Sequence, residues 1–368
     1  MAGGTACRAL ATAAFPSSMS NSAVVGAQPV GPARLTGLAL LLGILTALFY
    51  YKWGASLRVL TAVGERGTLA VSPATLLDGG VVAATRFYFG KIWPALTYGV
   101  LVGAAVRAAI PSRWVQRWLG GASARPTLVG ALLGAPLMLC SCCVTPIFSG
   151  LYERGARLGP ALAVLLASPG LNAAALVLGF ALLPLRVAGS RLAAALVIVF
   201  AIPALAGRLL ERPAATAAEA ACAVDAPVVA SEGDEDMRLP ALALRFVKSV
   251  VYMTVITVPL IVVGVLLSGL VMPYVSRLGA GGVVLAVVSV ALVATLVALP
   301  TFFEIPIALL LLAAGAPMGA AVAFVIAGPI VNLASLFVLG RETSPRVALF
   351  VAGGVWLVAS VAGLLCTL

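Results

Sequence analysis

Long apolar runs, many of them close to 20 residues, recur along this chain and leave few alternatives for its fold. Residues 35–51, 157–183 and 245–272 are examples. An α-helix needs about 20 residues to cross the roughly 30 Å of hydrocarbon in a bilayer. With 62% hydrophobic residues, 10% charged residues and a mean hydropathy of +1.15, the chain is too apolar for a soluble globule. The sequence therefore predicts an all-α integral membrane protein that crosses the bilayer several times.

The runs divide the chain into two large units that follow an N-terminal span. An eighth run, residues 68–89, carries Pro73, Asp78 and a glycine pair, so the arguments for and against a span there balance. Residues 211–240 are polar and acidic, which predicts a flexible linker. The other predicted spans are 35–51, 91–110, 157–183, 190–210, 245–272, 317–339 and 346–368. The predicted organisation is a tail at 1–33, a transmembrane helix and loop at 34–85, a first repeat at 86–210, the linker, and a second repeat at 241–368.

The two units are copies of each other. A shift of 160 residues places PIFSGLYERGARLGPALAVLLASPGLN, at 146–172, on PIALLLLAAGAPMGAAVAFVIAGPIVN, at 306–332. Because the matched residues include proline, glycine and asparagine, shared apolar composition does not explain this register. The matched pairs are Pro146 with Pro306, Gly155 with Gly315, Gly159 with Gly319, Pro169 with Pro329, and Asn172 with Asn332.

Each unit also contains an apolar segment that is interrupted near its middle. The interruption is CSCC, at 140–143, in the first unit and LPTFFEIP, at 299–306, in the second. The flanking runs are too short for two full crossings, so segments 127–154 and 281–314 are predicted to be re-entrant helical hairpins. A hairpin adds no net crossing, so each unit contributes three spans and the second must enter from the opposite side. The prediction is a pair of inverted repeats.

Two predicted spans are broken by the related motifs ASPGLN, at 167–172, and AGPIVN, at 327–332. Each proline frees a backbone carbonyl, and Asn172 and Asn332 stand where an N-cap would start the second part of each helix. For a single break, an ordinary proline kink is the simpler explanation. Two matched breaks beside two matched hairpins instead indicate a secondary transporter, whose site lies near the midplane where irregular backbone lines a cavity.

Three cysteines, Cys140, Cys142 and Cys143, lie within four positions at the first predicted tip. A single cysteine in a membrane helix usually packs as a small hydrophobic residue, but three at a turn favour a ligand site. Thiolates bind soft species such as Cu(I) or trivalent arsenic, and the chain has no histidine for a Cys/His zinc site. A strained disulfide between neighbouring cysteines is an alternative. We predict that the three cysteines are metal ligands and bind substrate together with Ser141, Asn172, Asn332, Thr301, Phe302 and Phe303.

Glu304 is the other residue with a predicted role, which is to couple transport to the movement of a proton or an ion. It is the only acidic residue in 279–340 and directly follows the second predicted tip. An ionisable group inside a membrane is costly, and such groups commonly relay protons or ions or balance the charge of a substrate. A carboxylate that caps the start of helix 305–314 explains the position equally well. The sequence leaves both roles open.

The runs GAPLMLCSCCVTP, GARLGPALAVLLASP and GAPMGAAVAFVIAGPIVN resemble the ArsP-like family of predicted permeases, which includes organoarsenical and heavy-metal efflux permeases. The resemblance covers about residues 86–368. It implies a multi-pass protein of the bacterial inner (plasma) membrane that exports a trivalent organoarsenical or a soft metal ion with the help of Cys140 and Cys142. The chain departs from the family pattern at Cys143, where a small residue is more usual, and at Met138, where proline is common.

Other function classes are excluded or stay as alternatives. The basic residues are scattered between apolar runs, so we expect no nucleic-acid partner. We find no Walker sequence and expect neither enzyme activity nor a cofactor. Two alternatives to a transporter are a channel-like pore for a small solute and a membrane thiol oxidoreductase. The expected partners are the lipid bilayer and the thiophilic substrate, and a homodimer is left open.

Overall fold

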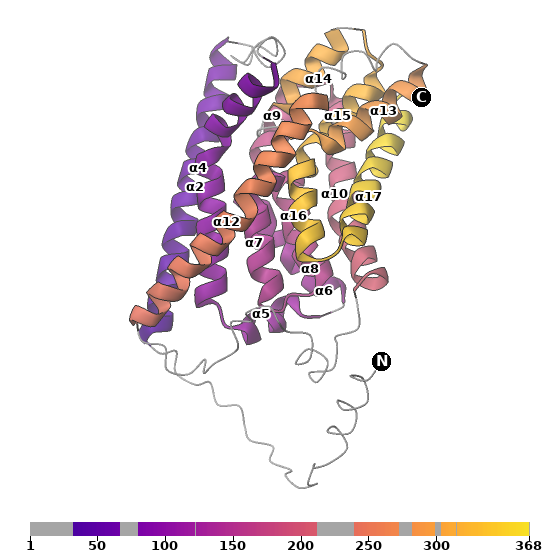
Figure 1. Ribbon diagram of the computed structural model, residues 1–368. Coiled ribbons are helices and arrows are strands. Elements are labelled where there is room, and N and C mark those ends of the chain that lie inside the picture. Colours follow the sequence, from indigo (N-terminus) through magenta and orange to yellow (C-terminus); the bar gives the residue numbers. More distant parts are fainter. Residues whose placement is uncertain are drawn as a thin grey trace.

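The structure is a computed structural model that describes residues 32–66, 80–121, 123–211, 239–271, 282–298, 303–313 and 315–367. Within these ranges all regular secondary structure is helical, which confirms the all-α prediction. The helices form an elongated bundle, with α2, α4 and α12 along one side and α10, α13 and α17 along the other (Figure 1). Most of the predicted tail and linker lies outside the described residues.

The first half of the bundle consists of a long helix that precedes the repeats and the helices of the first repeat. Residues 80–89 begin α4, so this part of the uncertain run 68–89 continues into the span predicted at 91–110, while 67–79 lie outside the described ranges. The elements are α2 (Pro32–Arg66), α4 (Gly80–Ala109), α5 (Ser112–Leu119), α6 (Ala124–Gly134), the 3-10 helix η1 (Ala135–Leu137), α7 (Ser141–Glu153), α8 (Leu158–Gly170), α9 (Ala173–Leu182) and α10 (Leu185–Leu209).

The second half repeats the helix boundaries of the first in the predicted register. The last three helices of each half begin 160 positions apart, at 158 and 318, 173 and 333, and 185 and 345. Gly155 and Gly315, which precede the first of these helices in each half, both have the positive φ that favours glycine. The elements are α12 (Leu239–Val271), α13 (Val283–Leu296), α14 (Glu304–Ala313), α15 (Met318–Ile330), α16 (Leu333–Glu342) and α17 (Pro345–Leu365).

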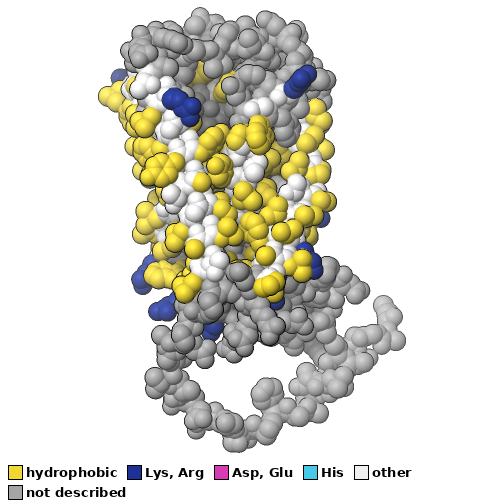
Figure 2. Space-filling model, turned by 90° about the vertical axis from the view of Figure 1, so that its left-hand side faces the viewer, with side chains coloured by type: hydrophobic (Ala, Val, Ile, Leu, Met, Phe, Trp, Pro, Cys, Tyr) yellow, Lys and Arg dark blue, Asp and Glu magenta, His cyan; other side chains and the backbone are white. Residues whose placement is uncertain are grey.

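The outer surface suits a bilayer. In the described chain, five helices are long and apolar enough to cross a membrane, or seven if each of two bent helix pairs counts as one span. Figure 2 shows hydrophobic side chains over the middle of one face, with lysine and arginine side chains near its two ends. Such a surface would drive association in water, whereas in a membrane it contacts lipid tails. The protein is therefore a multi-pass membrane protein.

The cysteine segment is broken in the middle, as predicted. Helices α6 and α7 have 11 and 13 residues, each well short of the roughly 20 that a span requires. Both open ends of the segment lie beside α5: α5 packs against α6, and the Leu119 carbonyl accepts a hydrogen bond from the Arg157 N–H at 2.9 Å. Arg107 of α4 also pairs with Glu153 at the end of α7, at 2.6 Å. The segment thus enters and leaves at the same end of the bundle.

The matching segment of the second half is described in two pieces. Helix α13 has 14 residues and α14 has 10, and residues 299–302 of the predicted tip lie outside the described ranges. Both α13 and α14 pack against α15, just as both α6 and α7 pack against α8. The two halves therefore share the packing of their hairpin arms against the first part of a broken helix.

Candidate functional site

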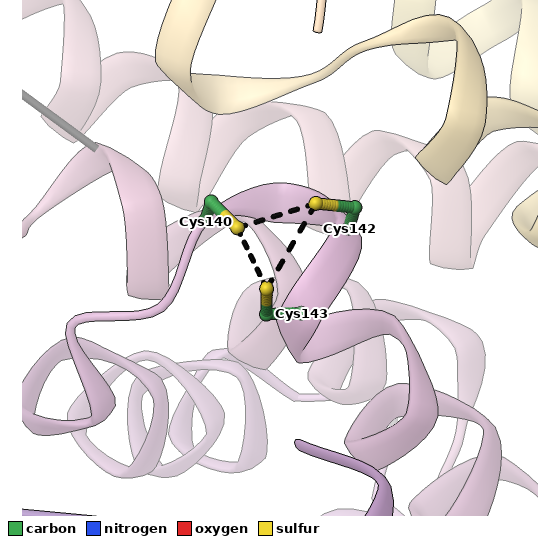
Figure 3. A group of neighbouring side chains, drawn as sticks. All are labelled: Cys140, Cys142 and Cys143. Atoms are coloured by element: carbon green, nitrogen blue, oxygen red, sulfur yellow. Dashed lines mark hydrogen bonds between the residues drawn. The ribbon is translucent and has the colours of Figure 1, made fainter. Parts of the chain in front are cut away.

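Three cysteine side chains converge at the start of α7 (Figure 3). Cys140 is the N-cap residue, with extended backbone, and Cys142 and Cys143 lie in the first turn. The Cys140 Sγ lies 3.2 Å from the Cys142 Sγ and 2.9 Å from the Cys143 Sγ, and the third edge of the triangle is 3.9 Å. All three residues are buried and carry free thiols, so the disulfide alternative does not match this structure.

The sulfur triangle can hold a thiophilic species through two or three bonds. With metal–sulfur bonds of about 2.3 Å, three ligand sulfurs lie roughly 4 Å apart, so only the two shorter edges need to lengthen. Among the described residues this group consists of the three cysteines alone, and an all-sulfur donor set selects soft species. The N-terminal end of α7 stabilises the negative charge that thiolates bring to this position.

The backbone that leads into the tip is bent and tightly held. Met138 has a φ of 49°, in the left-handed region that residues other than glycine rarely adopt. Ser168, near the end of α8, accepts a hydrogen bond from the Leu139 N–H at 3.0 Å and donates one to the Leu139 carbonyl at 3.3 Å. The Asn172 side chain donates to the Met138 carbonyl at 3.5 Å. The helix break of the first half thus positions the thiols.

The helix break of the second half reaches the same tip. The Nδ2 of Asn332 donates a hydrogen bond of 2.8 Å to the Oγ of Ser141, inside the Cys-Ser-Cys-Cys run. Asn332 is also the N-cap of α16, because its Oδ1 accepts a hydrogen bond from the Ser335 N–H at 2.9 Å and a capping box is complete. Asn172 caps α9 through the N–H three residues later, at 3.2 Å. Both predicted N-caps are therefore confirmed.

Helix α4 covers one side of the tip at close range. A Cβ built on Gly99 would overlap the carbonyl oxygen of Cys143, and one built on Gly103 would overlap that of Pro146. Only glycine permits the backbones of α4 and α7 to approach so closely. The two glycines lie four residues apart, on the face of α4 that packs against α7.

Helix α2, which precedes the repeats, packs against α4 and also contacts η1, which leads into the tip. The ring of its Tyr51 lies 5.5 Å from the ring of Tyr98 on α4, and Tyr51 interacts electrostatically with Cys143. Lys52 interacts electrostatically with Cys140. A role for α2 near the site was not predicted from the sequence.

Glu304 begins α14 and lies in an ion pair that the sequence did not predict. Its Oε1 accepts a hydrogen bond of 3.0 Å from the Nη2 of Arg191 on α10. The two side chains are only 2% and 3% exposed, respectively. The pair joins a helix of the first half to a hairpin arm of the second. Glu304 is the first residue of α14, but neither of its carboxylate oxygens accepts a hydrogen bond from a backbone N–H of the described residues, so the capping hydrogen bond of the alternative is not present among them.

The structure brings most, but not all, of the predicted site residues together. Phe303 is buried beside Glu304, whereas Thr301 and Phe302 lie outside the described residues. The sequence reading missed Ser168, although it stands in the duplicated ASPGLN motif, and it missed Arg191, a lone charge near the start of an apolar run. The residues that meet at the first tip are Cys140, Ser141, Cys142, Cys143, Asn172 and Asn332.

Comparison with known proteins agrees with this architecture. Residues 80–229 match the model of the ArsP_1 family, described as a predicted permease. Over these residues the chain is similar to this family of predicted permeases. The chain is 29% identical over 325 residues to UPF0718 protein YraQ of Escherichia coli K12, an alignment that covers 86% of this chain and 90% of that protein. It is 33% identical over 81 residues to UPF0718 protein MJ0584 of Methanocaldococcus jannaschii, or 22% of each chain.

No solved structure matches the permease. The family match begins at the first residue of α4 and includes the cysteine tip and the first broken helix. The resemblance inferred from the sequence motifs is thus confirmed. Similarity to a family of predicted permeases implies a transporter rather than an enzyme.

Proposed function

We propose that this permease is a secondary transporter that exports a thiophilic substrate through a site at Cys140, Cys142 and Cys143. The substrate is a trivalent organoarsenical or a soft metal ion. The observation that carries the proposal is the convergence of three buried free thiols at a tip where two broken helices meet. Soft ligands, irregular backbone and polar side chains inside an apolar bundle are the features of a transport site near the membrane midplane.

The three-sulfur arrangement suits a cargo that must be released again. A closed four-ligand cage holds its metal structurally, whereas two or three thiolates leave a position open for ligand exchange. Ser141, Asn172 and Asn332 surround the thiols with groups that can donate or accept hydrogen bonds. Thr301, Phe302 and Phe303 complete the proposed site from the second tip.

We further propose that the two halves are inverted repeats in the bacterial inner membrane. Two observations support this arrangement. A Cβ built on Gly170, at the end of α8, would lie 3.7 Å from Ile330, at the end of α15, so these broken helices point their ends at each other. The start of α8 also packs against the end of α10, as the start of α15 packs against the end of α17, through the glycine pairs Gly159 with Gly207 and Gly319 with Gly363.

Growth of a metal-sensitive host across a panel of arsenicals, copper and other thiophilic species tests this function. The wild-type protein is expected to raise tolerance to at least one of these compounds, and the Cys140→Ser, Cys142→Ser double variant to abolish the gain while still inserting. Cys366→Ser is the matched control, because Cys366 is a free cysteine remote in sequence from the tip. Equal tolerance with the double variant would contradict a thiolate mechanism.

Transport driven uphill by a proton gradient separates a carrier from the channel alternative. The proposed coupling group is Glu304. Oxidation of the tip cysteines during turnover would instead favour the thiol oxidoreductase.

A further inference from the structure

The Arg191–Glu304 pair lies in otherwise uncharged surroundings. Helices α8, α9 and α15, which pack against α10 or α14, contain no charged or titratable side chain. The charged residues on the remaining neighbours, and elsewhere on α10 itself, stand near the helix ends. These are Arg125 on α6, Arg186 and Arg208 on α10, and Arg346 on α17. Within this part of the bundle, Arg191 and Glu304 therefore depend on each other for charge balance.

Each partner keeps one atom unpaired. The Nη1 of Arg191 and the Oε2 of Glu304 are buried and have no hydrogen-bond partner among the described residues. Buried polar atoms are usually paired, and exceptions often mark a functional group or a water position. Since Oε1 accepts the hydrogen bond from Arg191, Oε2 is the oxygen that is free to take up a proton.

The duplication shows that the fold does not require charges at these positions. With the 160-residue shift, Glu304 corresponds to Val144 and Arg191 to Val351, and both valines are buried. The same helix positions are thus filled by apolar side chains in the other half. A Cβ built on Gly179 of α9 would lie 3.8 Å from the Nη1 of Arg191, in ordinary van der Waals contact, so α9 lies directly beside the guanidinium. Packing alone therefore does not explain the buried Arg191–Glu304 ion pair, which indicates a functional role for it.

We propose that Arg191 is the positioning residue for Glu304 and that the pair is a proton-operated latch between the two halves of the permease. This inference rests on the proposed function and adds to it the partner of the coupling group and the step that the proton controls. While Glu304 is ionised, the ion pair holds α14 against α10. Separating these helices would leave two uncompensated buried charges, which is strongly unfavourable.

Proton uptake lowers this obstacle, because only the Arg191 charge then remains. A proton from the aqueous side binds the Oε2 of Glu304, the carboxylate becomes a neutral acid, and the attraction to Arg191 weakens enough for α14 to move. When the proton leaves toward the other side, the carboxylate and the guanidinium pair again. One proton is carried per cycle, with no electron transfer and no covalent step on the substrate.

Reconstituted vesicles that hold the full-length permease test the latch, with phenylarsine oxide as the probe. Uphill export driven by a pH gradient and downhill exchange without one are measured for wild type, for each Gln single variant and for the Arg191→Gln, Glu304→Gln double variant. The single variants are expected to yield less folded protein, because one charge stays buried without its partner. The double variant is expected to fold, to keep downhill exchange and to lose uphill export by at least about tenfold.

The chain supplies both a control and a second version of the variant. Arg157 and Glu211 also pair at 3.0 Å but are more exposed, so the Arg157→Gln, Glu211→Gln variant should keep uphill export. If the glutamine pair fails to fold, Arg191→Val with Glu304→Val copies the matched residues of the other half. Full uphill export in a folded double variant overturns the latch alone. Failure of phenylarsine oxide to protect the tip cysteines of wild type from alkylation instead overturns the proposed function.

Discussion

The two hairpins occupy matched places in a duplicated chain, yet their tips carry different chemistry. The first tip presents three thiols within 3.9 Å of one another. Next to the second tip lies a carboxylate that is paired with an arginine. The positions matched to that ion pair, Val144 in the first half and Val351 in the second, both carry valine. The difference suggests a division of labour in which one hairpin holds the cargo and the other carries the charge that drives the cycle.

The two hairpins also differ in how the neighbouring long helix covers them. Helix α4 packs closely on α7 because Gly99 and Gly103 remove the side chains between the backbones. The matched positions on α12 are Pro259 and Val263, and α12 packs mainly against α4 and α16. Small residues permit close helix packing in membranes, whereas proline and valine hold the backbones apart. Close packing against a long helix thus characterises the hairpin arm α7.

The largest effect should come from the thiols. Cys140→Ser and Cys142→Ser should each weaken phenylarsine oxide binding by about 100-fold or more, because even changes next to a metal ligand cost 10- to 100-fold. The Cys140 Sγ lies within 3.2 Å of both other sulfurs, and its loss leaves only the Cys142 and Cys143 sulfurs, which are 3.9 Å apart. Cys143→Ser should cost less or change selectivity, since the family pattern does not require a thiol there. Equilibrium binding to purified protein measures all three.

The same binding assay sharpens the comparison of the hairpins. The Arg191→Gln, Glu304→Gln variant should bind phenylarsine oxide with nearly wild-type affinity, because its changes lie beside the charge-carrying tip. Full binding of phenylarsine oxide by a Cys140→Ser, Cys142→Ser variant would show that these cysteines only pack as small apolar residues. It would also contradict the division of labour between the two hairpins.

The close packing of α4 on the first hairpin should be the next most sensitive feature. Gly99→Ala places a methyl group against the Cys143 carbonyl, so it should lower the free energy of unfolding by about 1–3 kcal/mol. Thermal unfolding in detergent measures the loss. Gly43→Ala on α2 is the control, because a Cβ there meets open space. Equal melting temperatures for the two variants would show that α4 does not hold the tip.

The smallest predicted effect is the difference in stability between the Asn172→Ala and Asn332→Ala variants. Asn172→Ala and Asn332→Ala each remove an N-cap, which costs about 0.5–2 kcal/mol. Asn332 also donates a 2.8 Å hydrogen bond to Ser141, whereas the bond from Asn172 to Met138 is 3.5 Å long. The loss should therefore be larger for Asn332→Ala, by roughly 0.5–1.5 kcal/mol. Equal losses would mean that the second half does not stabilise the cargo tip through this bond.

Much of this architecture could be predicted from the sequence because its signals are local. The length of each apolar run limits where a helix can cross, and proline, glycine and asparagine mark where helices break and restart. The cysteine tip and both N-caps were found in this way. The duplication then gave the register of the second half without any structural knowledge. The domain boundaries and the inverted arrangement stay predictions.

The partners of these residues were decided by the tertiary structure alone. Arg191 and Glu304 are separated by 113 residues, and Asn332 and Ser141 by 191. Sequence periodicity shows which residues share a helix face, but it does not show which faces of distant helices meet. The apolar runs determined that this chain is a duplicated membrane bundle with thiols at one tip. Packing in three dimensions decided that both helix breaks support that tip and that the lone acid has an arginine beside it, because a buried charge is stable only where another element brings its counter-charge.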